Sequence, residues 1–299
     1  MNTSGRRARA GAVLLGLSLI SVLFAPVRAA ETTSIPDTAI LSRMKALATH
    51  RAIYDVHLAN TTDGGSMLRA DGRIVYEFTG SACAGFSTQY RFVTQFQPQS
   101  GPERLSDLRT SSFEDGDGKS FDFFNQSFMN EGLIEEQKGR AERGKDGSIA
   151  VALTKPKVDK LAIGREVLFP TQHLAALIEA ARRGDTIVNL KLYDGTDSGG
   201  KVTLASSIIG KEIPANTVPD DEPAAAAADL KSLRSWPITI SYYDADKPAA
   251  SGEAEPDYQM SFVLYENGVT RHMRFSFKEF TLDGRLTTFV PLPDKQTCE

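Results

Sequence analysis

The two cysteines are the residues of this chain best suited to redox or covalent chemistry, and they lie far apart. Cys83 falls in the stretch GSACAGFSTQ (80–89), and Cys298 is the penultimate of 299 residues. A redox-active pair is usually local, as in a Cys-x-x-Cys motif. Only one intramolecular disulfide can form, and closing so long a loop is worth at most roughly 5 kcal/mol in the chain-entropy description. The spacing therefore favours a structural disulfide over a redox site.

Two glycine-rich acidic stretches could bind a phosphate or a cation. EDGDGKS (114–120) ends like a phosphate-binding loop, but Phe113 stands where the first glycine of that loop belongs. A lysine also replaces an oxygen ligand that a calcium loop needs. YDGTDSGGK (193–201) carries Asp194 and Asp197, two carboxylates that could meet a cation. Both stretches are also typical of turns between strands, which is the interpretation we favour.

The remaining polar residues show no local catalytic pattern. The four histidines have no metal-pair spacing, and the Gly-x-Ser-x-Gly and His-Glu-x-x-His motifs are absent. A dispersed Ser/His/Asp constellation stays open at this level. The sequence predicts no catalytic residues, no cofactor or cofactor-binding residues and no metal site.

The N-terminus has the pattern of an export signal. Basic residues precede an uncharged apolar stretch (10–27), and VRA (27–29) follows it. This order predicts a secretory signal peptide over 1–29, cleaved after Ala29, and the stretch is short for a membrane span. An exported chain permits a disulfide. Cleavage removes four arginines and no acids, so the net charge changes from −4 to −8, which argues against nucleic acid and anionic lipid surfaces as partners.

The mature chain (30–299) alternates mainly with period two, as half-buried strands do. Asn267-Gly268, between two such runs, is the clearest hairpin signal. A dozen or so strands joined by short turns indicate an antiparallel sheet that must close or wrap to hide its edges. The sequence predicts a single all-β, barrel-like domain. The strand-like runs are 51–59, 72–80, 86–96, 119–129, 147–155, 185–195, 200–210, 237–244, 257–268 and 271–284.

Three segments depart from this alternation. The stretches 36–50 and 170–185 begin with Pro and carry an apolar stripe at helical spacing, so each is predicted to be a helix packed against the sheet. The segment 213–233, with three prolines and five consecutive alanines, is predicted to be an exposed connection with a short helix from Pro223 onward.

Several stretches resemble the EipB family of periplasmic cell-envelope-integrity proteins of Gram-negative bacteria. The resemblance covers essentially the whole mature chain in order, and the two cysteines are its most specific element. It implies an open, barrel-like β-spiral curled around a helix, with a disulfide between Cys83 and Cys298, and it carries over no catalytic residues. The stretches are HRAIYDVHL (50–58), GRIVYEFTGSACAGFSTQYRFVT (72–94), SSFEDGDGKSFDF (111–123), LFPTQH (168–173), YDGTDSGGKV (193–202) and SWPITISYYD (235–244).

Three hypotheses for the function follow. The favoured one is a non-enzymatic periplasmic protein that supports envelope integrity by binding another envelope component, a protein or peptidoglycan. The second is a carrier of lipid or lipoprotein acyl chains, whose interior could be lined by Phe121, Phe123, Phe124 and Phe128. Those phenylalanines could instead simply pack the core. The third and weakest is a cell-wall hydrolase, and exposed strand edges could pair two copies into a homodimer.

Overall fold

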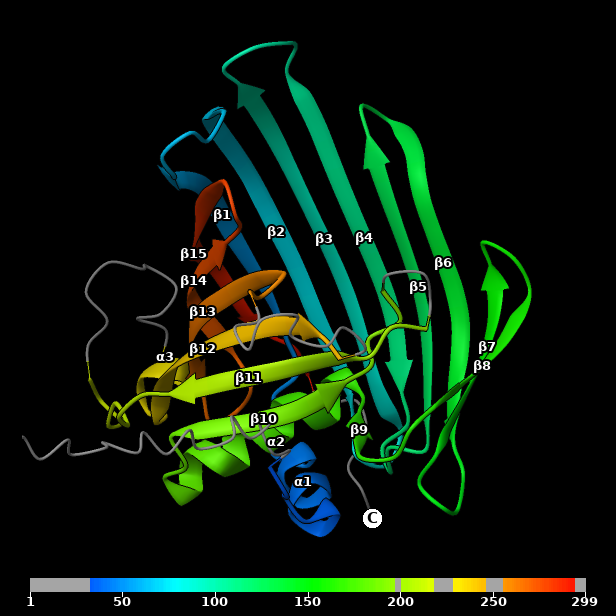
Figure 1. Cartoon of the computed structure of the whole chain (residues 1–299). Helices are drawn as coiled ribbons and strands as arrows, with labels where there is room; N and C mark the ends of the chain where they lie inside the picture. Colours follow the sequence, from blue (N-terminus) through cyan, green and yellow to red (C-terminus); the bar gives the residue numbers. More distant parts are fainter. Residues whose placement is uncertain (1–32, 197–199, 218–227, 246–254, 294–299) are drawn as a thin grey trace, which may run out of the picture.

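The computed structural model describes residues 33–196, 200–217, 228–245 and 255–293. The signal peptide predicted over 1–29 and the cysteine at position 298 lie outside these ranges. Within them, the protein is one long sheet curled on itself, with helices at one end (Figure 1). The predicted mostly-β, barrel-like architecture is therefore confirmed.

The sheet contains fifteen strands within the described ranges, and neighbours in space are almost always neighbours in sequence. Their order is β8-β7-β6-β5-β4-β3-β2-β1-β15-β14-β13-β12-β11-β10-β9. Every pairing is antiparallel except that of β9 with β10. The bounds are β1 His50–Thr61, β2 Met67–Ser81, β3 Gly85–Pro98, β4 Arg104–Glu114, β5 Ser120–Met129, β6 Gly132–Arg143, β7 Ile149–Lys155, β8 Asp159–Ile163, β9 Val167–Leu168, β10 Ile187–Leu192, β11 Thr203–Ile209, β12 Ser235–Asp244, β13 Tyr258–Tyr265, β14 Thr270–Ser276 and β15 Phe280–Pro291.

The two halves of the sheet differ in shape. Strands β2 to β6 are long and stand as a tall curved wall, whereas β10 to β12 cross on the opposite side, above the helices (Figure 1). The Asn267-Gly268 hairpin joins β13 to β14 as predicted, with Gly268 at φ 90°, a conformation that glycine adopts without strain.

Helix α2 (Pro170–Arg183) lies inside the curl and α1 (Asp37–Met44) packs on it. Helix α2 ends where Gly184 takes φ 83°, close to the predicted end at 185. Helix α1 is shorter than the predicted 36–50, because His50 already begins β1, which pairs with both β2 and β15. Tertiary pairing overrides the helical pattern there.

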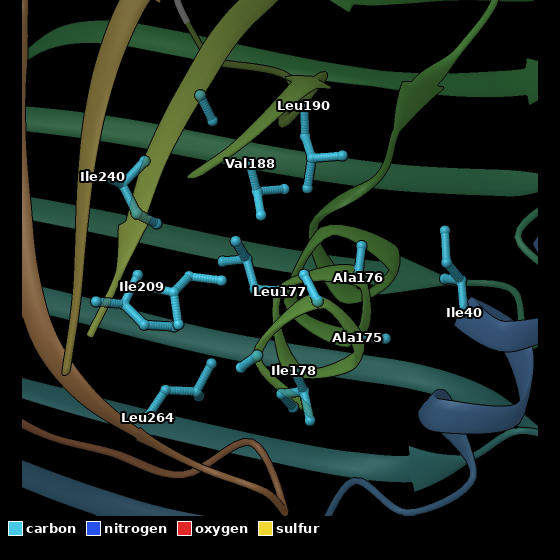
Figure 2. Packing of buried hydrophobic residues seen from close by; sticks show 14 of the residues in the cluster. Ile40, Ala175, Ala176, Leu177, Ile178, Val188, Leu190, Ile209, Ile240 and Leu264 are labelled. Atoms are coloured by element: carbon cyan, nitrogen blue, oxygen red, sulfur yellow. The ribbon is translucent and has the colours of Figure 1, made fainter. Parts of the chain in front are cut away.

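The largest core cluster surrounds α2. Leu177 and Ile178 of the helix meet aliphatic side chains from β10 to β13, among them Val188, Ile240 and Leu264 (Figure 2). All five are at most 1 % exposed. Burying each such side chain stabilises the fold by roughly 1.5–3 kcal/mol.

A second cluster joins the two ends of the sheet. Only residues 164–166 separate β8 from β9, so these outermost strands lie within roughly 14 Å of each other. Buried side chains from both ends fill the seam, and Phe121 stacks on Phe169 there with ring centroids 5.4 Å apart. The sheet is therefore nearly closed by packing, without strand pairing between its ends.

Four strands lie outside the predicted runs: β4, β6, β8 and β9. In addition, the single run expected over 271–284 is two strands, because the Phe277 N–H donates to the Phe280 carbonyl oxygen and reverses the chain. The connection 213–233 ends in a four-residue helix, α3 (Ala228–Lys231), whose Leu230 is fully buried in the core, so this end of the connection is packed rather than exposed.

Candidate functional site

A cavity of about 380 Å³ lies between the inner face of β2 to β5 and the start of α2. Its size falls in the range of roughly 300–1,000 Å³ that is typical of small-molecule sites. Most of its wall side chains are half-buried rather than buried, so the cavity opens to solvent. The lining residues are Tyr76, Phe78, Thr88, Tyr90, Leu108, Thr110, Ser112, Phe121, Pro170, Thr171, Leu174, Asp194, Thr196 and Met260.

The lining combines apolar surface with hydroxyl groups. Phe78, Leu174 and Met260 represent the apolar part, and five Thr or Ser residues and two Tyr residues supply hydroxyls. Burial raises the pKa of Tyr76 to about 12, although a hydrogen bond with Thr88 opposes the shift. The tyrosine hydroxyls are therefore neutral at physiological pH and can donate or accept hydrogen bonds.

A buried carboxylate fixes the start of α2 beside the cavity. The Thr171 and Gln172 backbone N–H groups donate to the two carboxylate oxygens of Glu114, at 2.7 and 3.1 Å. These N–H groups have no partner within the helix, and the helix dipole favours negative charge at this end. Glu114 is only 2 % exposed, and burial raises its pKa to about 7 despite these hydrogen bonds.

The loop after β10 brings one charged side chain to the cavity. Gly195 lies so close to the Phe123 ring that a side chain would not fit, and its carbonyl accepts a hydrogen bond of 3.0 Å from Asn125. The loop is thus attached to β5. Asp194, immediately before it, accepts hydrogen bonds from the Thr196 backbone N–H and hydroxyl, at 3.0 and 2.7 Å. Asp194 is the charged residue in the cavity lining.

Aromatic rings extend from the cavity along the inner face of the sheet. Tyr242 stacks on Tyr258 with centroids 4.5 Å apart, and Tyr258 lies 6.2 Å from Phe277. The rings of Phe280 and Phe96 continue this arc at centroid separations of 5.0 and 5.9 Å. Tyr258 and Phe277 are more than one-third exposed, so the arc offers aromatic surface to a ligand.

Comparison with known proteins places this architecture in a family. The family model described as EipB-like matches residues 42–293. The chain belongs to the EipB-like family. It is 38 % identical over 240 residues to the cell envelope integrity protein EipB of Brucella abortus (strain 2308), which covers 80 % of this chain and 82 % of that protein.

A solved structure supports the same placement. The crystal structure of a beta-barrel-like protein of domain of unknown function DUF1849, also from Brucella abortus, superposes with a TM-score of 0.74 at 35 % identity. The match covers 83 % of this chain and 99 % of that one. The EipB-like resemblance inferred from the sequence is therefore confirmed.

The four phenylalanines proposed to line the interior of this EipB-like barrel divide between two faces. Phe121 and Phe123 point inward and are buried in the seam, and Phe121 also reaches the cavity. Phe124 and Phe128 lie on the outer face, where Lys138 and Arg109 sit over their rings at 5.8 and 4.5 Å. The interior placement of this second pair is wrong, because successive strand residues alternate between faces. A ligand contact for Phe121 or Phe123 stays a prediction.

The outer face around Phe124 is polar and ion-paired. The buried Asp107 accepts hydrogen bonds from Arg91 and Arg109, and chiefly the Arg91 contact lowers its pKa to about 2. These arginines line a surface groove of about 390 Å³ together with Arg51 and Phe124. Since the arginine charges are largely matched by acids, the groove is a weaker candidate than the inner cavity.

Only one of the two cysteines of the predicted disulfide lies among the described residues. Cys83 lies in the exposed turn between β2 and β3, and Cys298 lies outside the described residues, so the bond stays a prediction. The last described residue, Pro293, lines a cavity together with Ala84, the neighbour of Cys83. Cys298 follows Pro293 by five positions, a reach of up to roughly 17 Å. The end of the described chain after β15 thus lies near that turn.

Of the other acidic candidates from the sequence, Asp197 lies outside the described residues. EDGDGKS forms the turn from β4 to β5, and its Glu114 is the helix-binding carboxylate. In the part of the chain that is described, no three His, Cys, Asp or Glu side chains cluster to hold a metal, and no helix is long and apolar enough to cross a membrane. Sequence reasoning missed Glu114 and the cavity tyrosines. The alternation of 72–80 and 86–96 carried a signal for Tyr76 and Tyr90, whereas nothing local marked Glu114.

Proposed function

We propose that this EipB-like protein supports cell envelope integrity in the periplasm by binding another envelope component in its inner cavity, without catalysis. The open cavity beside α2 is the main observation that supports this proposal. An unfilled cavity costs packing energy, and a bound ligand would recover part of that energy. The relative named for cell envelope integrity gives the biological setting. Export by the N-terminal signal and the disulfide between Cys83 and Cys298 belong to the same proposal.

Two neighbouring serines allow a matched test of the cavity. Ser112 lines the inner cavity, and Ser111 lines the groove on the outer face of the same strand. Ser112→Trp should fill the cavity and remove the protein's ability to restore growth of a deletion strain on an envelope-stressing detergent. Ser111→Trp should restore growth like the wild type.

The comparison has a clear contrary result. If Ser112→Trp folds, as judged by circular dichroism, and restores growth fully, the cavity is not the working surface. Release of soluble muropeptides from purified sacculi by the wild-type protein would contradict the absence of catalysis.

Transport of acyl chains is the second candidate, and the apolar surface favours it. The cavity meets the aromatic arc through Met260 and Tyr258, two inward positions of β13, so an extended apolar chain could follow the inner face. A neutral fluorescent acyl ester should then bind saturably to the wild type and to Ser111→Trp, and not to Ser112→Trp. Absence of saturable binding to the wild type would leave the carrier function without support.

A further inference from the structure

The charge in the cavity deepens the proposed function, on which this inference rests. Asp194 lines the cavity and is half-buried, and the Thr196 N–H and hydroxyl hold its carboxylate in place. Within the described ranges, no Lys, Arg or His side chain forms an ion pair with it. The cavity therefore presents one negative charge that no described Lys, Arg or His side chain neutralises by an ion pair.

Aromatic rings lie near this carboxylate, and Tyr76 and Tyr90 line the cavity itself. Burial raises the pKa of the Tyr193 and Tyr242 phenols, and the nearby Asp194 charge raises it further, so the electric field of Asp194 reaches both rings. Tyr242 stacks on the one-third exposed Tyr258, and Phe121 and Tyr193 meet edge to face with centroids 6.4 Å apart. A negative charge with aromatic rings nearby favours the binding of an ammonium group.

The positive charge near the cavity belongs to Arg143, which already contacts other groups of the protein. The Arg143 guanidinium donates to the Val167 carbonyl and the Gln172 side chain and lies over the Phe169 ring at 4.9 Å. It is thus turned to the start of α2, behind the wall formed by Pro170 and Thr171. The buried Glu114 lies on the same side, and its negative charge contributes to the raised pKa of Tyr76. An anionic ligand would meet the Asp194 carboxylate and no Lys, Arg or His side chain among the described residues of the lining.

We infer that the cavity selects ligands with an apolar body and an ammonium group, and disfavours ligands with a carboxylate or other anionic group. The apolar body lies against Phe78, Leu108 and Leu174, and the ammonium group lies against Asp194 among the tyrosine rings. The amine of a peptide or a lipid headgroup has this chemistry equally.

A series of ligands with one chain and different heads tests the inference. Octylamine, octyltrimethylammonium, octanol and octanoate are titrated by calorimetry into the mature protein at neutral pH, below their micelle concentrations. Both ammonium ligands should bind about 10-fold more tightly than octanoate, and the affinity of octanol should lie between those of the ammonium ligands and octanoate. Raising the salt concentration should weaken the binding of the two ammonium ligands, leave octanol unchanged, and not weaken octanoate, because salt screens attraction and repulsion alike.

Variants assign the preference to one side chain. Asp194→Asn should weaken both ammonium ligands about 10-fold and leave octanol unchanged, whereas Asp63→Asn, in the exposed turn before β2, should change nothing. If octanoate binds as tightly as octylamine, or Asp194→Asn keeps the preference, the inference is wrong while octanol binding still supports the cavity. If no ligand binds, octanol included, the cavity itself fails as a binding site. If Asp194→Asn does not fold, the wild-type ligand series and its salt dependence decide whether the cavity prefers ammonium ligands.

Discussion

The interior of the barrel has a filled half and an open half, and their strands differ accordingly. In the filled half, most inward positions of β10 and β12 are aliphatic and buried, as at Leu190 and Ile240. In the open half, several inward positions of β3 and β4 are hydroxylated and half-buried, as at Thr88 and Thr110. The same sheet thus builds a packed core on one side and a binding wall on the other.

The largest expected effect separates the seam from the outer face within one strand. Phe121→Ala removes a ring that stacks on Phe169 and Phe123 at 1 % exposure, and should lower the free energy of unfolding by about 3–5 kcal/mol. Phe124→Ala, on the outer face, should cost about 1 kcal/mol or less, since Phe124 is half-buried. Urea denaturation of both variants measures the difference. Equal losses would contradict the assignment of the two faces.

A pair of leucines compares the two halves directly. Leu177→Ala leaves a hole in the fully packed cluster around α2 and should cost about 2–5 kcal/mol. Leu108→Ala, in the half-buried cavity wall, should cost about 1 kcal/mol and mainly weaken the binding of octanol. If Leu108→Ala destabilises the protein as much as Leu177→Ala does, the cavity half is packed and the comparison fails.

The two halves also differ in how far the sequence predicts them. Strands with mostly aliphatic inward positions, such as β10 and β12, alternate clearly; the predicted run 185–195 contains β10, and the run 237–244 covers all but the first two residues of β12. The undetected strands β4 and β6 have polar residues on both faces, as RLSDLRTSSFE shows for β4. A wall that faces a cavity on one side and water on the other needs no apolar period. Of the strands that wall the cavity, β4 was missed for this reason, whereas β2, β3 and β5 overlap predicted runs.

Non-local contacts explain most of what remained hidden. Asp194 was recognised as a carboxylate in a turn, but its position at the cavity depends on the contacts of Gly195 with Asn125 and Phe123, 70 residues away in the first case. Glu114 looked like part of an acidic turn, and only α2 gives it a role. The error over Phe124 and Phe128 was avoidable, because strand alternation alone separates them from Phe121 and Phe123.

The proposed disulfide should add stability at the end of the barrel where β15 finishes. Cys83→Ser should lower the free energy of unfolding by about 2–4 kcal/mol under oxidising conditions. The wild type should fall to the same value in reductant, whereas the variant should be insensitive to reductant. Equal stability of the oxidised wild type and the variant would show that no such disulfide stabilises the protein.

Glu114 gives the smallest effect, and it appears as a dependence on pH. Its pKa is about 7 in the folded protein and near its ordinary value of 4.5 when unfolded, so the folded state holds the proton between these values. Its contribution to stability is thus complete below about pH 4.5 and declines as the pH rises to about 7, by at most about 3 kcal/mol. His173 acts in the opposite direction, because burial lowers its pKa to about 4 and stability then rises between about pH 4 and 6.5.

The two opposing slopes make a variant comparison more informative than the wild-type curve. Subtracting the unfolding free energies of Glu114→Gln from those of the wild type, at steps from pH 4.5 to 7.5, cancels the His173 contribution and should leave a declining difference. The absolute stability of Glu114→Gln does not matter for this slope, although an amide can accept only one of the two helix N–H bonds. His173→Gln should steepen the decline of the wild-type curve. A flat difference would mean that Glu114 stays ionised, in which case α2 begins on a permanent negative charge and the cavity beside it is more strongly biased toward cations.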